Sequence, residues 1–456
     1  MVKTGVFGVR HIQCFLLLLS YSTFTMQVVG AKLTLMLMAA SNKGTSGTIG
    51  KDESLQIMFG SLRGNALDFI EHPMKTILSF SAGIWSVNRR VKYLILGLGL
   101  YGTISSYTIN LFIRVYGWQV LLMHEIVLLI LKSMADPLLY SLIAKWVPTN
   151  EQGKLVQLIF PGQLLGALLE YTIGYYLGKP QEEWIQVLIW AGNCSVLWAI
   201  AWAAFAADHP KTCFYIERTE RQYIQEHLRN TAKYGVEKKI PWSKIFLTPE
   251  LYPIIFTHSC VIWAQETGYL CLNSYFSFVH KQDLNLIAPM LGYSHLSALI
   301  IALPIGIVVD LLVSKKVQLS RIRNVITCIG MWGAAAAIVL MGQAPTVLFA
   351  QVMAGFYITF TTPLYVGVYL NYLDFSPNFA GLLFGIGSAI AYFIAIGVPL
   401  VRNALVQHDD RIGWNQFMYT SALANYLGGL VYSLYSSTKI QPFNTLSAQK
   451  GIGTDV

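Results

Sequence analysis

Apolar runs of about twenty residues recur along the whole 456-residue chain, and this feature limits the fold more than any other. A bilayer core about 30 Å thick needs roughly 20 apolar residues per helix. Hydrophobic residues make up 54% of the chain and charged residues only 12%, against about 25% charged in soluble proteins. The sequence therefore predicts an all-α membrane protein. Its twelve transmembrane helices are expected at 12–38, 66–86, 92–113, 117–142, 155–178, 184–206, 251–279, 286–312, 324–342, 345–371, 379–402 and 414–436.

Two of the twelve runs are less regular than the others. The second begins among charged residues that include Asp68, Glu71 and Lys75, so its apolar part is short. The first follows a basic start and also resembles a secretory signal peptide. We favour a membrane span there, because the apolar character continues to Ala40 without a clear cleavage site.

Lysine and arginine are distributed unevenly between the two expected sides of the membrane. With the N-terminus in the cytoplasm, the inner loops and tails hold 21 of these residues and the outer loops hold 7. Basic residues concentrate in the cytoplasmic loops of membrane proteins. Both termini are therefore expected in the cytoplasm. The net charge of +9 follows from this bias and does not indicate a nucleic-acid partner; the partner that the composition predicts is the lipid bilayer.

The residue types of common catalytic and metal sites are not grouped in this sequence. The six cysteines are scattered and form neither a CxxC pair nor a zinc-binding spacing. The chain also shows no nucleophile elbow and no phosphate-binding loop. The sequence therefore predicts neither an enzyme nor a bound cofactor.

One long polar interval divides the spans six and six. Residues 217–229 within it have charges at i, i+4 spacing and are expected to form a surface helix. The division into two sets of six spans suggests a duplication that gives two pseudo-symmetric bundles. The expected division is an N-terminal bundle at 1–206, a cytoplasmic linker at 207–250, a C-terminal bundle at 251–436 and a cytoplasmic tail at 437–456.

A short motif recurs at corresponding places in the two halves. Gly83 lies among small residues ahead of the basic pair at 89–90. Gly306 lies four residues before Asp310 and ahead of the basic pair at 315–316. In both halves, the end of a helix with small residues leads into a basic cytoplasmic loop.

These motifs resemble the loop signature of the major facilitator superfamily. Finer matches resemble its anion–cation symporter family, which contains the sodium–phosphate cotransporters, sialin and the vesicular glutamate transporters. The matches are the segment Lys-Trp-Val-Pro-Thr-Asn-Glu at 145–151, the segment 371–381 before helix eleven, and the start of helix twelve at 413–417. They cover the chain from about residue 140 to the end, whereas residues 1–135 match loosely. The resemblance implies the major facilitator fold, with gating or structural roles for Gly83, Glu151, Gly306, Asp310, Asn371 and Asp374.

The sequence departs from the family where such a transporter binds its substrate. Gln27 stands in place of an arginine on the first helix, and Val87 stands in place of an acid in the first loop signature. On the fourth helix, Glu125 and Lys132 occupy the positions of an arginine and a glutamate, so the two charges are exchanged. The anion-binding residues must therefore be sought among the charges at membrane depth.

Six charged residues are candidates for a position at membrane depth. A charge at the bilayer centre costs about 2.5–3.5 kcal/mol on insertion scales, so such residues usually face a cavity or one another. Glu125 and Lys132 are nearly two helical turns apart and share a face. Either they line the substrate path, with Lys132 attracting anions, or they are a structural pair. The six residues are Lys32, Glu125, Lys132, Asp136, Glu170 and Glu266.

The other intramembrane charges also leave alternatives open. Lys32 either replaces the missing arginine of the first helix or pairs with a buried acid such as Glu170 or Glu266. Glu266 is either the acid that titrates during transport or an acid held permanently by Lys32 or Lys132. Asp136, beside a proline, is expected near the cytoplasmic end of its helix in a structural role.

Together these features predict a secondary transporter of inorganic or organic anions, phosphate-like or carboxylate-like, that works by alternating access. A small anion is the expected partner, and Na⁺ or H⁺ is the expected coupling ion unless the membrane potential drives transport. The alternative is a non-transporting relative that serves as a membrane scaffold or sensor. The absence of a dileucine-type address in the N-terminal tail favours the plasma membrane over a vesicular or lysosomal membrane. The candidates for the substrate and coupling path are Gln27, Lys32, Glu125, Lys132 and Glu266.

Overall fold

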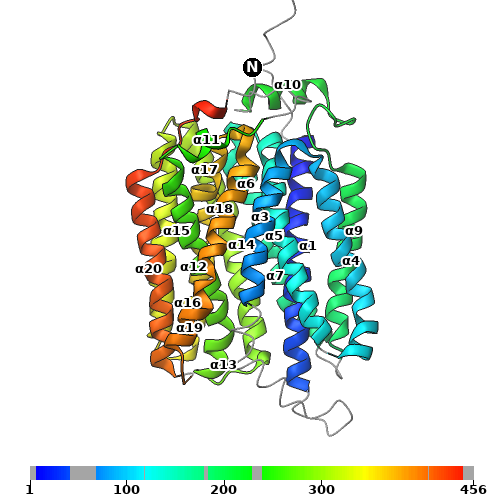
Figure 1. Ribbon diagram of the computed structural model, residues 1–456, viewed down its shortest axis with the longest axis vertical. Coiled ribbons are helices and arrows are strands. Elements are labelled where there is room, and N and C mark those ends of the chain that lie inside the picture. The colour runs from blue at the N-terminus through cyan, green and yellow to red at the C-terminus, as the bar shows by residue number, and fades with distance from the viewer. Residues whose placement is uncertain are drawn as a thin grey trace, which may run out of the picture.

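The computed structural model describes residues 7–41, 68–117, 119–178, 183–228, 239–408 and 410–444. Within these ranges the regular structure is helical, and the long helices run side by side along the longest axis of the molecule (Figure 1). The first half contains α1 (Val9–Ser41), α3 (Asp68–Asn88), α4 (Val91–Tyr116), α5 (Gln119–Trp146), α6 (Gln152–Ile159), α7 (Gly162–Leu169), η3 (Glu170–Gly174), α8 (Tyr175–Gly178) and α9 (Ile185–Phe205).

Two short helices, α10 (Arg218–His227) and α11 (Trp242–Phe246), connect the halves. The second half contains α12 (Leu251–Leu270), η5 (Cys271–Tyr275), α13 (Phe276–Phe278), α14 (Leu284–Ser314), α15 (Leu319–Gly342), α16 (Val347–Thr359), η6 (Tyr365–Tyr369), α17 (Leu370–Phe375), η7 (Pro377–Phe379), α18 (Ala380–Ala395), α19 (Gly397–Leu405), α20 (Arg411–Tyr435) and η8 (Pro442–Asn444).

Each predicted span overlaps at least one helix in the described part of the chain, and eight of the described helical segments are long and apolar enough to cross a membrane. The remaining predicted spans fall on α3, α12, α16 with α17, and α20. In α3, Glu71, His72 and Lys75 lower the mean hydropathy, as the sequence indicated. The surface helix expected at 217–229 is α10, which begins and ends within two residues of that range. The all-α prediction is therefore correct.

Two of the spans are broken within the membrane-crossing region. The fifth span runs from Thr149 to Gly178 and is interrupted near Pro161, whose ring lacks the N–H that a continuous helix needs. It is interrupted again by the π-helical turn η3. In the tenth span, Gly367 in η6 has non-helical backbone angles. Such π-helical turns widen a helix locally and are frequent at functional sites.

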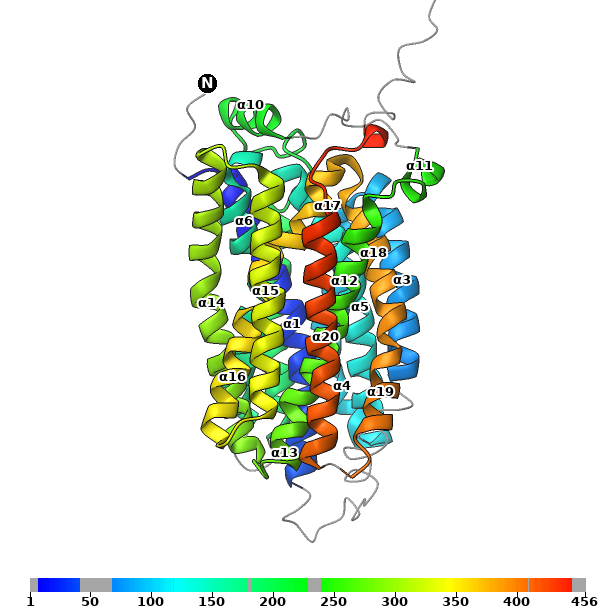
Figure 2. The ribbon, with the colours of Figure 1, turned by 90° about the vertical axis from the view of Figure 1, so that its left-hand side faces the viewer.

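The two ends of the bundle differ in structure. The start of the described chain, α10, α11 and η8 lie at one end, and α13 lies at the opposite end (Figures 1 and 2). We call these ends the α10 face and the α13 face. In Figure 1 the helices before α10 lie on the right and those after α11 lie on the left. The domain boundaries at 206, 250 and 436 stay a prediction.

The halves pack closely along α3 with α18 and along α6 with α14. A Cβ atom added to Gly83 of α3 would lie 3.2 Å from the Cα atom of Gly385 in α18, so only glycine permits this approach without displacement. Tyr140 of α5 stacks on Phe384 of α18, with 4.5 Å between ring centroids. The buried core is therefore continuous between the halves on this side.

Candidate functional site

A cluster of charged side chains lies where helices of both halves meet. On α3, Glu71 and Lys75 form an ion pair one helical turn apart. The Lys75 Nζ atom also lies 3.5 Å from Oε1 of Glu266, which comes from α12 in the second half. The same Oε1 atom lies 4.0 Å from Nε2 of His72. The Lys75 side chain is 7% exposed, so its positive charge is held almost out of solvent by two carboxylates.

Aromatic and charged groups from further helices complete this cluster. The Nζ atom of Lys75 lies 5.2 Å from the ring centroid of Tyr392, on α18. The charges that act on Lys132, on α5, are those of Asp136, Lys75 and Glu266. Lysines and carboxylates thus gather from α3, α5 and α12.

The position expected for Asp136 was wrong, whereas its structural role stays a prediction. It lies about ten residues, or about 15 Å, before the end of α5, well inside the span and one turn from Lys132. Its Oδ1 atom is buried and has no hydrogen-bond partner within the described residues. Asp136 therefore belongs to the charged cluster and not to the end of the helix.

Lys32 is among the charges that act on Glu266, one of the two acids suggested as its partner. Glu170 is fully buried, and both of its carboxyl oxygens lack a hydrogen-bond partner in the described part of the chain. A Cβ atom at Gly30 or at Gly174 would come within 2.9 and 2.6 Å of the Glu170 carboxyl, so these two glycines make room for it.

Two of the sequence candidates lie outside this cluster. Gln27 of α1 is 3% exposed and donates a hydrogen bond from Nε2 to Oγ of Ser195, 2.8 Å away on α9. Glu125 is 7% exposed and lies about 10.5 Å along α5 from Lys132. The charges that act on Lys132 come instead from Asp136, Lys75 and Glu266.

A second group of polar contacts joins the halves towards the α10 face. Asp310, on α14, accepts hydrogen bonds from the backbone N–H groups of Gly153 and Lys154 at 2.6 and 3.0 Å. These N–H groups lie in the first turn of α6, where a negative charge is favoured by the helix dipole. Gly306, one turn before Asp310, lies so close to Gly153 that a Cβ atom on either glycine would meet the carbonyl oxygen of the other.

A buried arginine lies near this junction. Arg323 of α15 is 1% exposed and donates from Nε to Oδ2 of Asp374 at 2.7 Å. It also donates to the Val366 carbonyl at 2.8 Å and to Gln152 in the first half at 3.4 Å. Asn371, in the same segment as Asp374, is fully buried. Arg323 therefore ties the broken tenth span to the start of the fifth.

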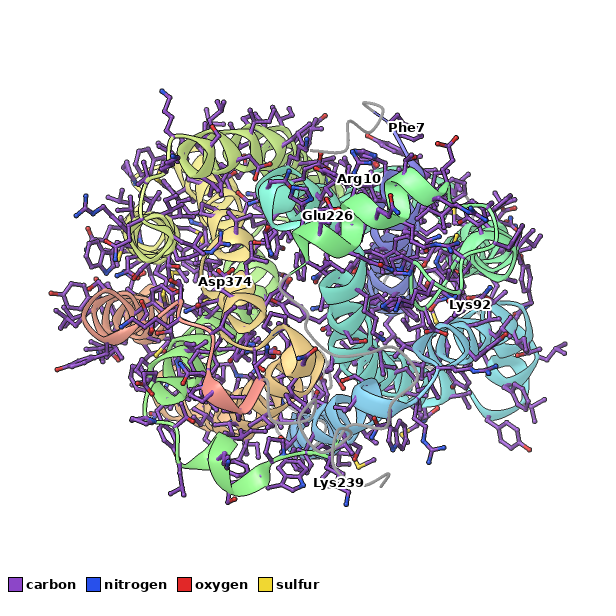
Figure 3. All side chains as sticks on the ribbon, turned by 90° about the horizontal axis from the view of Figure 1, so that it is seen from above. Phe7, Arg10, Lys92, Glu226, Lys239 and Asp374 are labelled. Carbon is purple, nitrogen blue, oxygen red and sulfur yellow. The ribbon has the colours of Figure 1, made fainter. Side chains whose placement is uncertain are left out.

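The connecting helix α10 is attached to the first half by a further ion-pair network. Arg10 of α1 lies 2.9 Å from Glu151 and 3.0 Å from Glu220 of α10. Its guanidinium carbon lies 5.1 Å from the ring centroid of Tyr223. Burial in this contact raises the pKa of the Tyr223 phenol. Figure 3 shows Arg10 and Asp374 on the α10 face, above different groups of helices.

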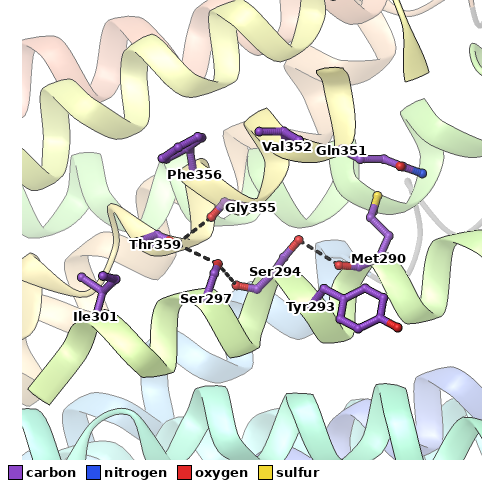
Figure 4. Close-up of a pocket in the computed structure, with 10 residues that line it drawn as sticks. All are labelled: Met290, Tyr293, Ser294, Ser297, Ile301, Gln351, Val352, Gly355, Phe356 and Thr359. Carbon is purple, nitrogen blue, oxygen red and sulfur yellow. Dashed lines mark hydrogen bonds between the residues drawn. The ribbon is translucent and has the colours of Figure 1, made fainter. Parts of the chain in front are cut away.

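A cavity of about 410 Å³ lies between α14 and α16, away from the charged cluster (Figure 4). Its lining combines apolar side chains with the amide of Gln351 and the hydroxyl groups of Tyr293, Ser294, Ser297 and Thr359. The Ser297 and Thr359 hydroxyl oxygens are 3.0 Å apart. Because its lining includes the exposed side chain of Tyr293, the cavity opens on the outer surface of the bundle and does not lie between the halves.

Sequence reasoning missed Lys75 and Arg323. Lys75 was grouped with the charges at the edge of a poor span, although the Glu71–Lys75 spacing of four residues is typical of an ion pair on one helix face. Arg323 was counted as a loop residue, because it directly precedes the predicted span at 324–342. The structure places it inside α15.

Comparisons with known proteins agree with this architecture. The sequence profile of the Major Facilitator Superfamily matches residues 74–399. Vesicular glutamate transporter 2 of Bos taurus is 26% identical over 328 residues, which cover 69% of this chain and 54% of the relative. Vesicular glutamate transporter 3 of Danio rerio is 26% identical over 338 residues, covering 71% and 56%. The chain thus aligns with about half the length of these curated relatives.

Solved structures show the same fold. The proton:xylose symporter XylE superimposes with a TM-score of 0.67 at 15% identity, covering 96% of this chain and 98% of that one. The human organic anion transporter MFSD10 gives a TM-score of 0.61 at 12% identity, covering 93% and 99%. The twelve-helix fold and the family resemblance predicted from the motifs are confirmed, and the chain belongs to the major facilitator superfamily.

Proposed function

We propose that this protein is a secondary transporter of small anions that binds its substrate at the charged cluster between the halves. The observation that supports this most directly is the position of Lys75 and Lys132, two cations at membrane depth beside the second-half acid Glu266. Charged groups at membrane depth mark substrate or ion paths, and the substrate sites of such transporters lie at the interface of their repeats. The relatives at 26% identity are named as transporters of glutamate, which is an anion at neutral pH.

The substrate class remains that predicted from the sequence, a phosphate-like or carboxylate-like anion. Transport by alternating access would expose the cluster to each side in turn. We further propose coupling to H⁺ or Na⁺, with Glu266 as the acid that changes its partner during the cycle. Of the paired side chains in the cluster it is the most exposed, at 24%, against 12% for Glu71.

Orientation and location are part of this proposal. The protein is a multi-pass membrane protein, and its basic loops are expected on the cytoplasmic side. The α10 face would then be cytoplasmic, with both termini on that side. The plasma membrane is the proposed location.

The test is uptake into proteoliposomes that contain the purified protein, with radiolabelled phosphate and glutamate as separate probes. Lys132→Gln should lower uptake by about tenfold or more, since a hydrogen bond to a charged group contributes about 1.5–3 kcal/mol. Lys132→Arg should retain part of the uptake, and Lys244→Gln, which changes an exposed lysine on α11, should have no effect. Imposing a pH gradient and a Na⁺ gradient separately identifies the coupling ion.

If the wild-type protein is folded normally but takes up neither anion, transport of these anion classes is contradicted. The alternative of a membrane scaffold or sensor is then favoured. If wild type and Lys132→Gln take up the anion equally, the proposal that the charged cluster lies on the substrate path is refuted.

A further inference from the structure

Lys75 is shared by two carboxylates that differ in their attachment. Glu71 lies one turn away on the same helix, so it stays beside Lys75 however the halves move. Glu266 comes from α12 of the second half, and its Oε1 atom reaches both Lys75 and His72, at 3.5 and 4.0 Å. One acid is therefore a fixed partner of the lysine, and the other is a partner only while the halves hold their present arrangement.

The Glu266 carboxylate would compete with the proposed substrate for Lys75. A carboxylate or phosphate that pairs with the Lys75 ammonium group meets Glu71, which is fixed on the same helix, and Glu266, which reaches Lys75 from the second half at 3.5 Å. The greater exposure of Glu266 means that it is also the partner that solvent or a ligand can reach first.

We infer that Glu266 is a tethered anion that occupies the substrate's place at Lys75 in the unloaded protein and is displaced when substrate binds. Glu71 is then a positioning residue, which keeps Lys75 paired after Glu266 leaves. This inference rests on the proposed anion transport and describes how the anion-binding site of the transporter is regulated.

The energetics explain why two acids are needed. An ammonium group buried without a partner costs several kcal/mol. If Glu266 were the single partner of Lys75, its departure would leave that cost unopposed until the substrate arrived. With Glu71 in place, the exchange of Glu266 for a substrate anion replaces one ion pair by a similar one. Lys32 and Lys132 interact electrostatically with Glu266, and the Tyr392 ring centroid lies 5.2 Å from the Lys75 Nζ atom.

The two acids can be separated by the sign of their effects. Glu266→Gln removes the competitor, so KM for anion uptake should fall by about three- to tenfold, and the maximal rate should fall as well, because the substrate is released more slowly. Glu71→Gln leaves Lys75 to pair fully with Glu266, so KM should rise by a similar factor. A general loss of negative charge near the site would instead lower KM in both variants.

Binding can be measured without transport. The shift in melting temperature of the detergent-solubilised protein on adding glutamate or phosphate should be larger for Glu266→Gln than for wild type and smaller for Glu71→Gln. Glu226→Gln, an exposed change on α10, is the matched control and should behave as wild type. Glu266→Asp keeps the charge but shortens the tether, and its KM should lie between those of wild type and Glu266→Gln.

Different failures have different meanings. If wild type transports neither probe anion, the proposed function is refuted, and so is this inference, which rests on it. If wild type transports but Glu266→Gln and Glu71→Gln shift KM in the same direction, transport stands and the tethered anion is refuted. Equal anion-induced shifts in melting temperature for wild type and both variants would refute it independently of any transport measurement.

Discussion

The hydrogen bonds from α6 to Asp310 offer a direct test of how the two halves are held together near the α10 face. The carboxylate accepts from two backbone N–H groups of the other half, at 2.6 and 3.0 Å. In Asp310→Asn, the side chain has one acceptor oxygen and an NH₂ group, so one N–H loses its acceptor and the negative charge at the start of α6 is gone. Losing a charge-assisted hydrogen bond costs about 1.5–3 kcal/mol, and losing the interaction with the helix dipole adds about 0.3–1 kcal/mol.

A total of about 2–4 kcal/mol corresponds to a change of about 30-fold to several hundred-fold in the equilibrium between joined and separated halves at this face. Spin labels at Lys154 and Lys315 would report the separation of α6 from α14, and Asp310→Asn should show a new, longer distance. Asp410→Asn is the matched control, because Asp410 caps α20 within one half by accepting from Gly413 N–H at 2.8 Å. That variant should lose stability without changing the distance.

The same change should impair uptake more than substitutions at Val87, the corresponding position of the first half. The reasoning is refuted if Asp310→Asn has the wild-type distance distribution and loses no more stability than Asp410→Asn. Near-normal uptake by both Asp310→Asn and Val87→Ala would contradict the proposed role of Asp310 in transport.

Three further predictions concern contacts near the α10 face and the side of the membrane on which that face lies. Arg323→Ala and Asp374→Ala should each lower the free energy of unfolding by about 3–5 kcal/mol, because each leaves a buried charge unpaired. The double variant should lose less than the sum of the two losses. Additive losses in a thermal melt in detergent would show that the two charges are not coupled. Asn444→Ala removes the acceptor for the Ser376 hydroxyl and the Asn378 N–H, both at 3.0 Å, and should cost about 1–3 kcal/mol; unchanged hydrogen exchange around residue 444 would count against that contact. In a background without the native cysteines, Asn230→Cys, which lies outside the described residues, should resist an impermeant thiol reagent added to intact cells, and ready labelling would overturn the proposed orientation.

The arrangement of spans was predictable because the bilayer imposes a length on each apolar run. The run predicted at 184–206 is α9, Ile185–Phe205, and the run at 12–38 lies within α1. Even the poor second span is a full helix, since burial of Lys75 between two acids compensates for its charges. Hydropathy along the chain is a local quantity, and membrane crossing depends mainly on local composition.

The contacts of the charged cluster were not predictable in the same way. Lys75 and Glu266 lie far apart in the sequence, in different halves of the chain. A hydropathy profile counts each charge as unfavourable in a membrane span and does not indicate which side chain it contacts. The sequence did single out Glu266 and Lys132, because charges at membrane depth are uncommon. It could not select Lys75 over Gln27, since that choice depends on how α3 is rotated about its axis against α12.

The glycine contact between α6 and α14 can serve as a pivot as long as the Asp310 hydrogen bonds hold the two helices together. Gly153 and Gly306 meet backbone to backbone near one end of the bundle, and α14 extends about 33 Å from Gly306 to its first residue, Leu284. If the halves turn as rigid bodies about this point, a rotation of about 10° moves the far end of that lever arm by about 6 Å. The same rotation hardly changes the distance between the two glycines. A bulky side chain at either glycine would clash there with the carbonyl oxygen of the other, and by tilting one half it would also displace the opposite face, about 30 Å away.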